Sequence, residues 1–177
     1  MKEKIKPTIV LTLICVAASL LLVLAHEMTK DSIAEQKEKK FSSSVEALFG
    51  KTDITLLDTN FGAEGIEAIA VTPDGKTAVQ VIADGYSKGG INILVGIDET
   101  GKISKIEFIS LGETPGLGSK VKDLSTFREQ FYGDSESPVE LDAVSGATFS
   151  SKGMKKAVEA ALDVYNNNKE AILSGRK

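Results

Sequence analysis

The hydrophobic positions near the N-terminus form one unbroken run. Residues 7–25 (PTIVLTLICVAASLLLVLA) contain no charged side chain, and as a helix they would span about 28 Å at ~1.5 Å per residue. This length matches the hydrocarbon thickness of a bilayer and predicts a transmembrane helix. Lys2, Lys4 and Lys6 precede the run. Because lysine is enriched on the cytoplasmic side, we expect a cytoplasmic N-terminus and an extracytoplasmic main domain.

Two alternatives to a membrane anchor exist for this run, a cleaved signal peptide and a lipid anchor. Val23 and Ala25 satisfy the small-residue rule of signal-peptide cleavage, although the run is long for a signal peptide. A lipid anchor on Cys15 is disfavoured, because Ile14 occupies the position where a small residue is expected and the apolar run continues past the cysteine. We therefore assign residues 1–26 to an N-terminal membrane anchor in a single-pass protein.

The pattern changes after residue 26. Residues 27–50 are polar and helix-forming, with apolar side chains at intervals and Gly50 as a stop signal, which predicts a helical stalk. Residues 65–71 and 77–83 are apolar or alternating around a Pro-Asp-Gly turn, and residues 91–98 and 102–110 are joined by ETGK. Both pairs predict antiparallel hairpins of one sheet.

Helical spacing returns at residues 121–131 and 150–168. In the second segment we expect the apolar side chains to pack on the sheet, namely Met154, Ala157, Val158, Ala161, Leu162 and Tyr165. The predicted fold class is α+β: an N-terminal transmembrane helix followed by one domain, residues 51–177, with an antiparallel sheet flanked by helices.

Composition and charge narrow the range of functions. His26 and Cys15 are the only residues of their types, so protein ligands for structural zinc, iron–sulfur clusters and haem are lacking. No calcium-loop pattern is present, and we expect no metal site. A redox function would therefore need an organic cofactor. The chain beyond residue 26 holds 18 basic and 24 acidic residues, which argues against nucleic acid as a partner.

Three short segments combine glycine with hydroxyl residues. For residues 84–90 (DGYSKGG) and 111–120 (LGETPGLGSK), turn chemistry alone is a sufficient explanation, and neither is a nucleotide fingerprint. The third segment, residues 142–153 (DAVSGATFSSKG), precedes a predicted helix. A helix N-terminus exposes unpaired amides and favours a phosphate. The alternative is that Thr148 or Ser150 is an ordinary helix cap.

The third segment also carries a resemblance to a known family. Asp142, Ser145, Gly146, Ala147 and Thr148 match the D-x-x-S-G-A-T sequence that a flavin transferase recognises in the FMN-binding domains of Rnf and Na⁺-translocating NADH:quinone reductase complexes. Residues 113–118 match the ETPGLG loop of the G-subunit family of Rnf complexes, and Gly85-Tyr86 with Gly89-Gly90-Ile91 resembles its Gly-Tyr-Gly-Gly-Ile region. The resemblance covers nearly the whole chain.

The chain departs from this family at two places. Ser110-Leu111-Gly112 stands where many relatives carry a histidine before ETPGLG, and Ser87-Lys88 is inserted in the tyrosine loop. Both departures concern the tuning of a flavin or its partner, and neither touches the position of attachment.

The resemblance implies a set of cofactor-binding residues. Thr148 would be esterified to the FMN phosphate as a covalent flavin, with Ser145 or Ser150 and the backbone at Gly146 and Ala147 around the phosphate. The backbone at Gly116 and Gly118 would lie against the isoalloxazine, with a hydrogen bond from Thr114 and an apolar contact from Leu117. Asp142 would be read by the transferase.

For Glu113, Tyr86 and Tyr132 the sequence leaves both a flavin-binding and a purely structural interpretation open. Glu113 has either a flavin-side role or that of a solvated or turn-capping carboxylate. Tyr86 and Tyr132 are candidates for stacking on a flavin, although a tyrosine buried in the core is the commoner arrangement.

The implied function is a one-electron relay. The chain would be a subunit of a membrane-bound Rnf-type complex that couples electron flow between ferredoxin and NAD⁺ to Na⁺ or H⁺ transport, with the other subunits as partners. We expect no turnover from the chain alone and no catalytic residues. The alternatives are an FMN-binding subunit of another extracytoplasmic electron-transfer chain and a flavin-free, membrane-anchored assembly module.

Overall fold

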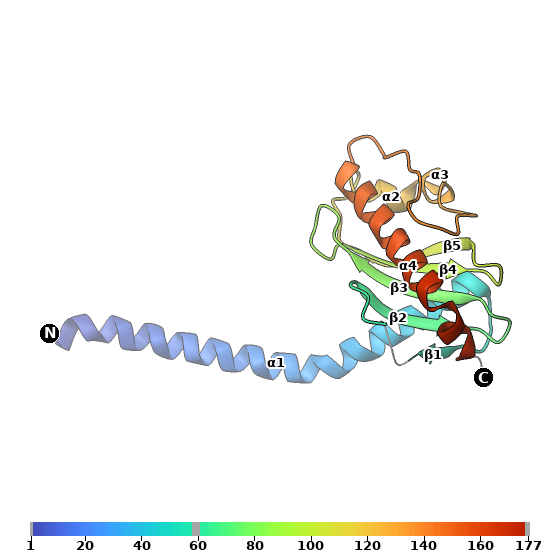
Figure 1. Ribbon diagram of the computed structural model, residues 1–177. Coiled ribbons are helices and arrows are strands. Elements are labelled where there is room, and N and C mark those ends of the chain that lie inside the picture. Colours follow the sequence, from blue (N-terminus) through green and yellow to red (C-terminus); the bar gives the residue numbers. More distant parts are fainter. Residues whose placement is uncertain (1, 58–60, 176–177) are drawn as a thin grey trace. The chain divides into compact units, whose positions relative to one another are not determined.

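The computed structural model describes residues 2–57 and 61–175, with side chains from Pro7 onward (Figure 1). The chain divides into two compact units, Met1–Phe41 and Ser42–Lys177. One helix, α1 (Lys2–Phe49), contains both the predicted anchor and the predicted stalk. The predicted domain boundaries after residues 26 and 50 stay predictions.

The apolar part of α1 is exposed along its whole length. Leu13 and Leu21 are each 68% exposed, as expected of side chains that lipid would cover. Among the described residues, α1 is the helix that is long and apolar enough to cross a membrane. The side chains of Lys2, Lys4 and Lys6 lie outside the described residues, so the predicted orientation stays a prediction.

The second unit is built on a five-stranded antiparallel sheet in sequential order. The strands are β1 (Thr55–Leu57), β2 (Ile66–Val71), β3 (Thr77–Ala83), β4 (Ile91–Ile97) and β5 (Ile103–Leu111). Both predicted hairpins are confirmed, as β2–β3 and β4–β5. The pattern did not predict β1, because three residues are too few to show a period of two.

The β4–β5 turn shows why these hairpins form. The Asp98 carboxylate accepts hydrogen bonds from the Thr100 amide at 2.8 Å, the Thr100 hydroxyl at 2.6 Å and the Lys102 amide at 3.0 Å. Partial burial acts to raise the pKa of Asp98, but these hydrogen bonds outweigh it and hold the pKa below 3.8. An ionised aspartate therefore closes the turn with charge-assisted hydrogen bonds.

One face of the sheet is covered by α4 (Thr148–Ser174), as Figure 1 shows. The register places Val81, Ile93 and Phe108 side by side on this face. The six side chains of the predicted packing face are all buried, which confirms that prediction and the α+β fold. The helix begins at Thr148 rather than Ser150 and ends at Ser174 rather than Asn168, because the buried Ile172 continues its packing beyond a kink at Asn168.

The opposite face is covered in part by residues 42–49 of α1. Val45 is 3% exposed, and a Cβ on Gly96 of β4 would lie 3.3 Å from Leu48 Cδ2. The Lys105 ammonium of β5 donates to the Ala47 carbonyl at 2.8 Å. The sheet therefore has a hydrophobic layer on both faces, and the end of α1 belongs to the domain.

The prediction of one helix over residues 121–131 is wrong. The structure has two short helices, α2 (Lys120–Asp123) and α3 (Ser125–Glu129), separated by Leu124 in an extended conformation (φ −89°, ψ 108°). On one straight helix Val121 would point to a different side from Phe127. The break at Leu124 allows both side chains to reach the core, where each is buried.

Candidate functional site

The first part of the site is the turn at residues 114–117. The Leu117 amide donates to the Thr114 carbonyl at 3.2 Å, and Gly116 has φ +74°. Proline second and a positive φ third are the features of a type II turn, which favours glycine at the third position. The Ser119 hydroxyl accepts a hydrogen bond from the Gly116 amide at 2.9 Å and so braces the turn.

A second turn of the same kind lies at residues 144–147. The Ala147 amide donates to the Val144 carbonyl at 2.9 Å, and Gly146 has φ +78°. The buried Ser151 hydroxyl accepts a hydrogen bond from the Val144 amide at 3.0 Å. The Ser-Gly pair is therefore the centre of a type II turn that leads directly into α4.

The start of α4 has no side-chain cap. Ala147 is the N-cap residue and makes no side-chain hydrogen bond, so the interpretation of Thr148 or Ser150 as an ordinary N-cap is wrong. The amides of Thr148, Phe149 and Ser150 have no acceptor within the helix, because they precede the first i→i−4 hydrogen bond. Together with the helix dipole they favour an anion at this point.

The two turns and the start of α4 surround an open pocket of about 410 Å³. Its lining combines the exposed Thr148 hydroxyl with apolar and aromatic side chains. The lining residues are Tyr86, Thr114, Leu117, Gly118, Gly146, Ala147, Thr148, Phe149 and Ser150. Tyr86 and Phe149 contact each other edge to face, with ring centroids 6.4 Å apart.

The exposure of Tyr86 differs from that of a core tyrosine. Tyr86 is 74% exposed, so the interpretation of Tyr86 as a core residue is wrong. Tyr132 is partly buried and packs against the core, as expected of a core tyrosine.

Glu113 lies beneath the pocket and not in its lining. It is 6% exposed, so the interpretation as a solvated carboxylate is wrong. The carboxylate accepts hydrogen bonds from the Tyr86 amide at 3.0 Å and the Ser87 amide at 3.1 Å, and the Ser150 hydroxyl also donates to it. Burial acts to raise the pKa of Glu113, but these hydrogen bonds outweigh it and hold the pKa below 4.5.

Glycines make room for this carboxylate on three sides. A Cβ on Gly85, Gly90 or Gly118 would lie 2.6, 2.5 or 2.9 Å from the nearest Glu113 atom. These distances are too short for any real side chain, so the three positions need glycine. Gly85 and Gly90 of the tyrosine loop and Gly118 of ETPGLG therefore make room for one buried acid.

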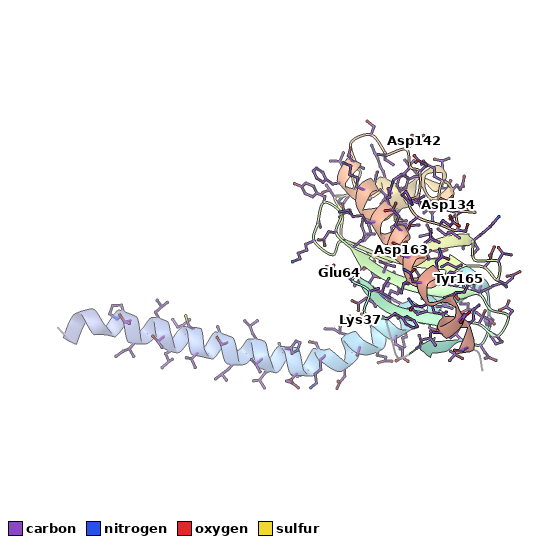
Figure 2. The ribbon with its side chains drawn as sticks, viewed as in Figure 1. Lys37, Glu64, Asp134, Asp142, Asp163 and Tyr165 are labelled. Carbon is purple, nitrogen blue, oxygen red and sulfur yellow. The ribbon has the colours of Figure 1, made fainter. Side chains whose placement is uncertain are left out.

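Most of the other predicted site residues come together around the pocket. Thr148, Gly146, Ala147, Ser150, Thr114, Leu117 and Gly118 line it. Gly116 shapes the turn behind it, and Ser145 lies exposed in the second turn. Asp142 lies earlier in the connection between α3 and α4 and is exposed at the edge of the domain (Figure 2).

The backbone of Asp142 is held by the side chain of Gln130. The Gln130 amide group accepts from the Asp142 backbone N–H at 2.8 Å and donates to the Asp142 carbonyl at 3.3 Å. This pairing fixes the backbone of Asp142 and leaves its carboxylate in solvent. Asp142, Ser145 and Thr148 are all exposed.

Sequence reasoning missed Phe149 as a site residue. It is 69% exposed although the next residues of α4 are buried. The signal was present in the pattern, because Phe149 falls outside the apolar positions that recur at helical spacing. A large apolar residue placed off the core face of a helix is a candidate for ligand contact.

Comparison with protein families gives a match to the FMN-binding domain over residues 85–163. The chain is 30% identical to the G subunit of the ion-translocating oxidoreductase complex of Shewanella baltica (strain OS223), with 96% of this chain and 93% of that protein covered. The protein of the same name from Aliivibrio fischeri (strain MJ11) is 27% identical with the same coverage. The G subunit of the Na⁺-translocating ferredoxin:NAD⁺ oxidoreductase complex of Acetobacterium woodii is 28% identical, with 77% of this chain and 74% of that protein covered.

Proposed function

The chain belongs to the family of G subunits of ion-translocating oxidoreductase complexes, and we propose that within such a complex it is an electron-transfer subunit that carries FMN. The observation that carries this proposal is the pocket at the start of α4, which lies inside the segment that matches the FMN-binding domain.

The residues of the pocket fit the two chemically different ends of FMN. The uncapped amides at the start of α4 suit a phosphate. Leu117, Phe149 and Tyr86 offer apolar and aromatic surface for a planar ring system. The backbone of the turn at residues 114–117 has no large side chain toward the pocket except Leu117, so a ring can come close to it.

We propose that FMN is attached to Thr148 through a phosphoester. Thr148 is exposed at the point where the free amides converge, so its hydroxyl lies where the phosphate would be held. Relative to free FMN, the attachment forms one bond between Thr148 Oγ and phosphorus with the loss of one water. Because Asp142 and Ser145 are also exposed, a flavin transferase can read the D-x-x-S-G-A-T segment on the folded domain.

The residues in and around the pocket differ in the hydrogen bonds that they can offer to FMN. FMN supplies the redox chemistry, while the protein binds and orients it. The Ser150 hydroxyl donates its hydrogen to Glu113, so it offers the pocket an acceptor oxygen. This leaves Ser145 and the amides of α4 as the phosphate donors, with the Thr114 hydroxyl available to the ring.

The location follows from α1 in the same proposal. Residues 1–26 anchor the chain in the membrane, with the N-terminus in the cytoplasm and the FMN domain outside. A covalent bond then keeps the cofactor from diffusing into the medium. The other subunits of the complex supply and accept the electrons, which couples ferredoxin and NAD⁺ to the transport of Na⁺ or H⁺.

The variant Thr148→Ala tests this function in the host membrane. If the chain relays electrons through FMN on Thr148, the variant lacks the hydroxyl that holds the carrier. Ferredoxin-dependent reduction of NAD⁺ by the membranes should then fall at least about tenfold, which corresponds to about 1.4 kcal/mol in the barrier. The assembled complex should still contain the variant chain. Full activity with Thr148→Ala would favour the assembly module, and unchanged activity in a strain lacking the chain would favour a separate electron-transfer chain.

A further inference from the structure

The tip of the tyrosine loop is connected to the rest of the pocket through Glu113. Inside the loop, the Gly85 and Gly90 amides donate to the Ser87 carbonyl, and the Gly89 amide donates to the Asp84 carboxylate. The amides of Tyr86 and Ser87 instead point across the chain to Glu113, 27 and 26 residues away. The position of the Tyr86 ring over the pocket therefore depends on this carboxylate.

The same carboxylate also joins the other two walls of the pocket. Glu113 immediately precedes the turn at residues 114–117, and the Ser150 hydroxyl in the first turn of α4 donates to it. Gly118 packs directly on Glu113, since a Cβ there would lie 2.9 Å from both Glu113 Cβ and Oε2. Each wall of the pocket thus has one residue in contact with Glu113: Tyr86, Gly118 and Ser150.

We propose that Glu113 is a positioning residue, whose buried carboxylate joins the tyrosine loop, the turn at residues 114–117 and the first turn of α4 and so holds the pocket in its binding shape. This proposal rests on the proposed function only because it takes the pocket to be the FMN-binding site. Glu113 acts through Tyr86, Ser87 and Ser150 and does not touch the cofactor.

The charge of Glu113 is essential to this role. All three of its partners donate, so the ionised form, which only accepts, is the one that they favour. No ion pair to Glu113 is found in residues 7–57 and 61–175. The charged groups on the tyrosine loop, on α2 and in the first turn of α4 are Asp84, Lys88, Lys120, Lys122, Asp123 and Lys152.

The pH dependence of the pocket follows from the lowered pKa. A carboxyl group whose folded pKa lies below its unfolded value stabilises the fold above the unfolded pKa and loses this effect as the pH falls through the folded pKa. The loop should therefore be held at neutral pH and released only as the pH falls through the lowered pKa of Glu113.

Hydrogen exchange of the Tyr86 and Ser87 amides in the full chain, in detergent and without flavin, tests the proposal directly. Glu113→Gln keeps the shape and removes the charge. We expect exchange at these two amides to rise by about tenfold or more, which corresponds to about 1.4 kcal/mol. Exchange in β3 and β4 should stay unchanged. In the wild-type chain, exchange corrected for its intrinsic pH dependence should rise as the pH falls through the lowered pKa of Glu113, and this step should be absent in Glu113→Gln.

Glu159→Gln is the matched control. Glu159 also accepts a backbone hydrogen bond, from the Val139 amide at 3.0 Å, but it lies outside the pocket. It should leave the Tyr86 and Ser87 amides protected. The Gly89 amide donates to Asp84 and not to Glu113, so its exchange reports on the loop separately from the Glu113 contacts.

Two results would overturn the proposal. The first is unchanged exchange of the Tyr86 and Ser87 amides in Glu113→Gln, and the second is an equal increase throughout the sheet, which would make Glu113 an ordinary stabilising residue. If Glu113→Gln does not fold, Ser150→Ala decides: it removes one donor to the carboxylate, so the pH at which the loop is released should rise, and an unchanged pH would contradict the proposal.

The flavin-loaded chain gives a second measurement. Fluorescence anisotropy decay of bound FMN should show faster local motion in Glu113→Gln than in the wild-type chain, and equal motion in both would count against the proposal. If the wild-type chain takes up no FMN, the proposed function fails, but the exchange experiment still decides the role of Glu113.

Discussion

At the scale of single residues, the site depends on positions where a side chain is absent. Gly85, Gly90 and Gly118 admit the buried Glu113 carboxylate, and Gly153 admits the backbone of the tyrosine loop. Gly85, Gly90 and Gly118 lie within segments that turn chemistry alone would explain, and Gly153 lies within a predicted helix. Their shared reason is close packing around one acid and one helix, so exchanging them affects the pocket and not only the local backbone.

Replacement of Gly153 by alanine should destabilise the domain. A Cβ at this position would lie 2.4 Å from the Asp84 carbonyl oxygen and 2.9 Å from Gly85 Cα, both backbone atoms. Alanine gains about 1 kcal/mol in helix propensity, but overpacking that must move backbone lies at the upper end of its usual range and costs about 2–3 kcal/mol. We expect a net loss of about 1–2 kcal/mol in the free energy of unfolding, measured by denaturant titration.

Gly112→Ala is the control for this prediction. A Cβ on Gly112 would lie 3.5 Å from Gly90 Cα, an ordinary contact on an exposed residue. Its effect should stay within about 0.5 kcal/mol. Gly153→Ala with wild-type stability would mean that α4 does not press on the tyrosine loop.

At the scale of elements, the sequence pattern predicted the hairpins and the packing face of α4, because these depend on residues that are close in sequence. The β2–β3 and β4–β5 hairpins follow from alternation and turn residues, and the packing face of α4 follows from its helical period. β1 is too short for a pattern. The break at Leu124 could not be predicted, because it depends on where the core lies relative to Val121 and Phe127.

The same distinction holds for the candidate site. The turns at residues 114–117 and 144–147 are visible in sequence, since each needs glycine at its third position. The contacts of Glu113 span 26 to 37 residues, and no local pattern shows them. Sequence therefore indicated the parts of the pocket and Glu113 as a candidate, and the fold revealed that Glu113 connects these parts.

At the scale of the whole molecule, the chain combines an exposed apolar helix with a domain that has its own core. The apolar part of α1 falls in the unit Met1–Phe41, and the sheet, α4 and the pocket all fall in the unit Ser42–Lys177. Such a division suits an anchored domain whose cofactor works outside the lipid, because the pocket residues lie far along the chain from the candidate span.

The orientation of the chain can be tested on intact cells. We expect protease added to spheroplasts of the host to digest the domain without lysis, since lysines before the span keep the N-terminus inside. Replacing Lys2, Lys4 and Lys6 with glutamate is the control and should reduce this digestion. Protection of the wild-type domain until the membrane is broken would contradict the proposed topology, and a mature chain that begins after Ala25 would show that the helix is a cleaved signal.

The most direct test of the central claim is the intact mass of the chain after expression with a flavin transferase. The wild-type chain should gain the mass of FMN less one water, and Thr148→Ala should gain nothing, because its side chain lacks the hydroxyl that forms the ester. Thr114→Ala, which removes the other threonine hydroxyl of the pocket, should keep the full gain. An unmodified wild-type chain beside a transferase that is active on another substrate would contradict the claim, as would a gain that persists in Thr148→Ala.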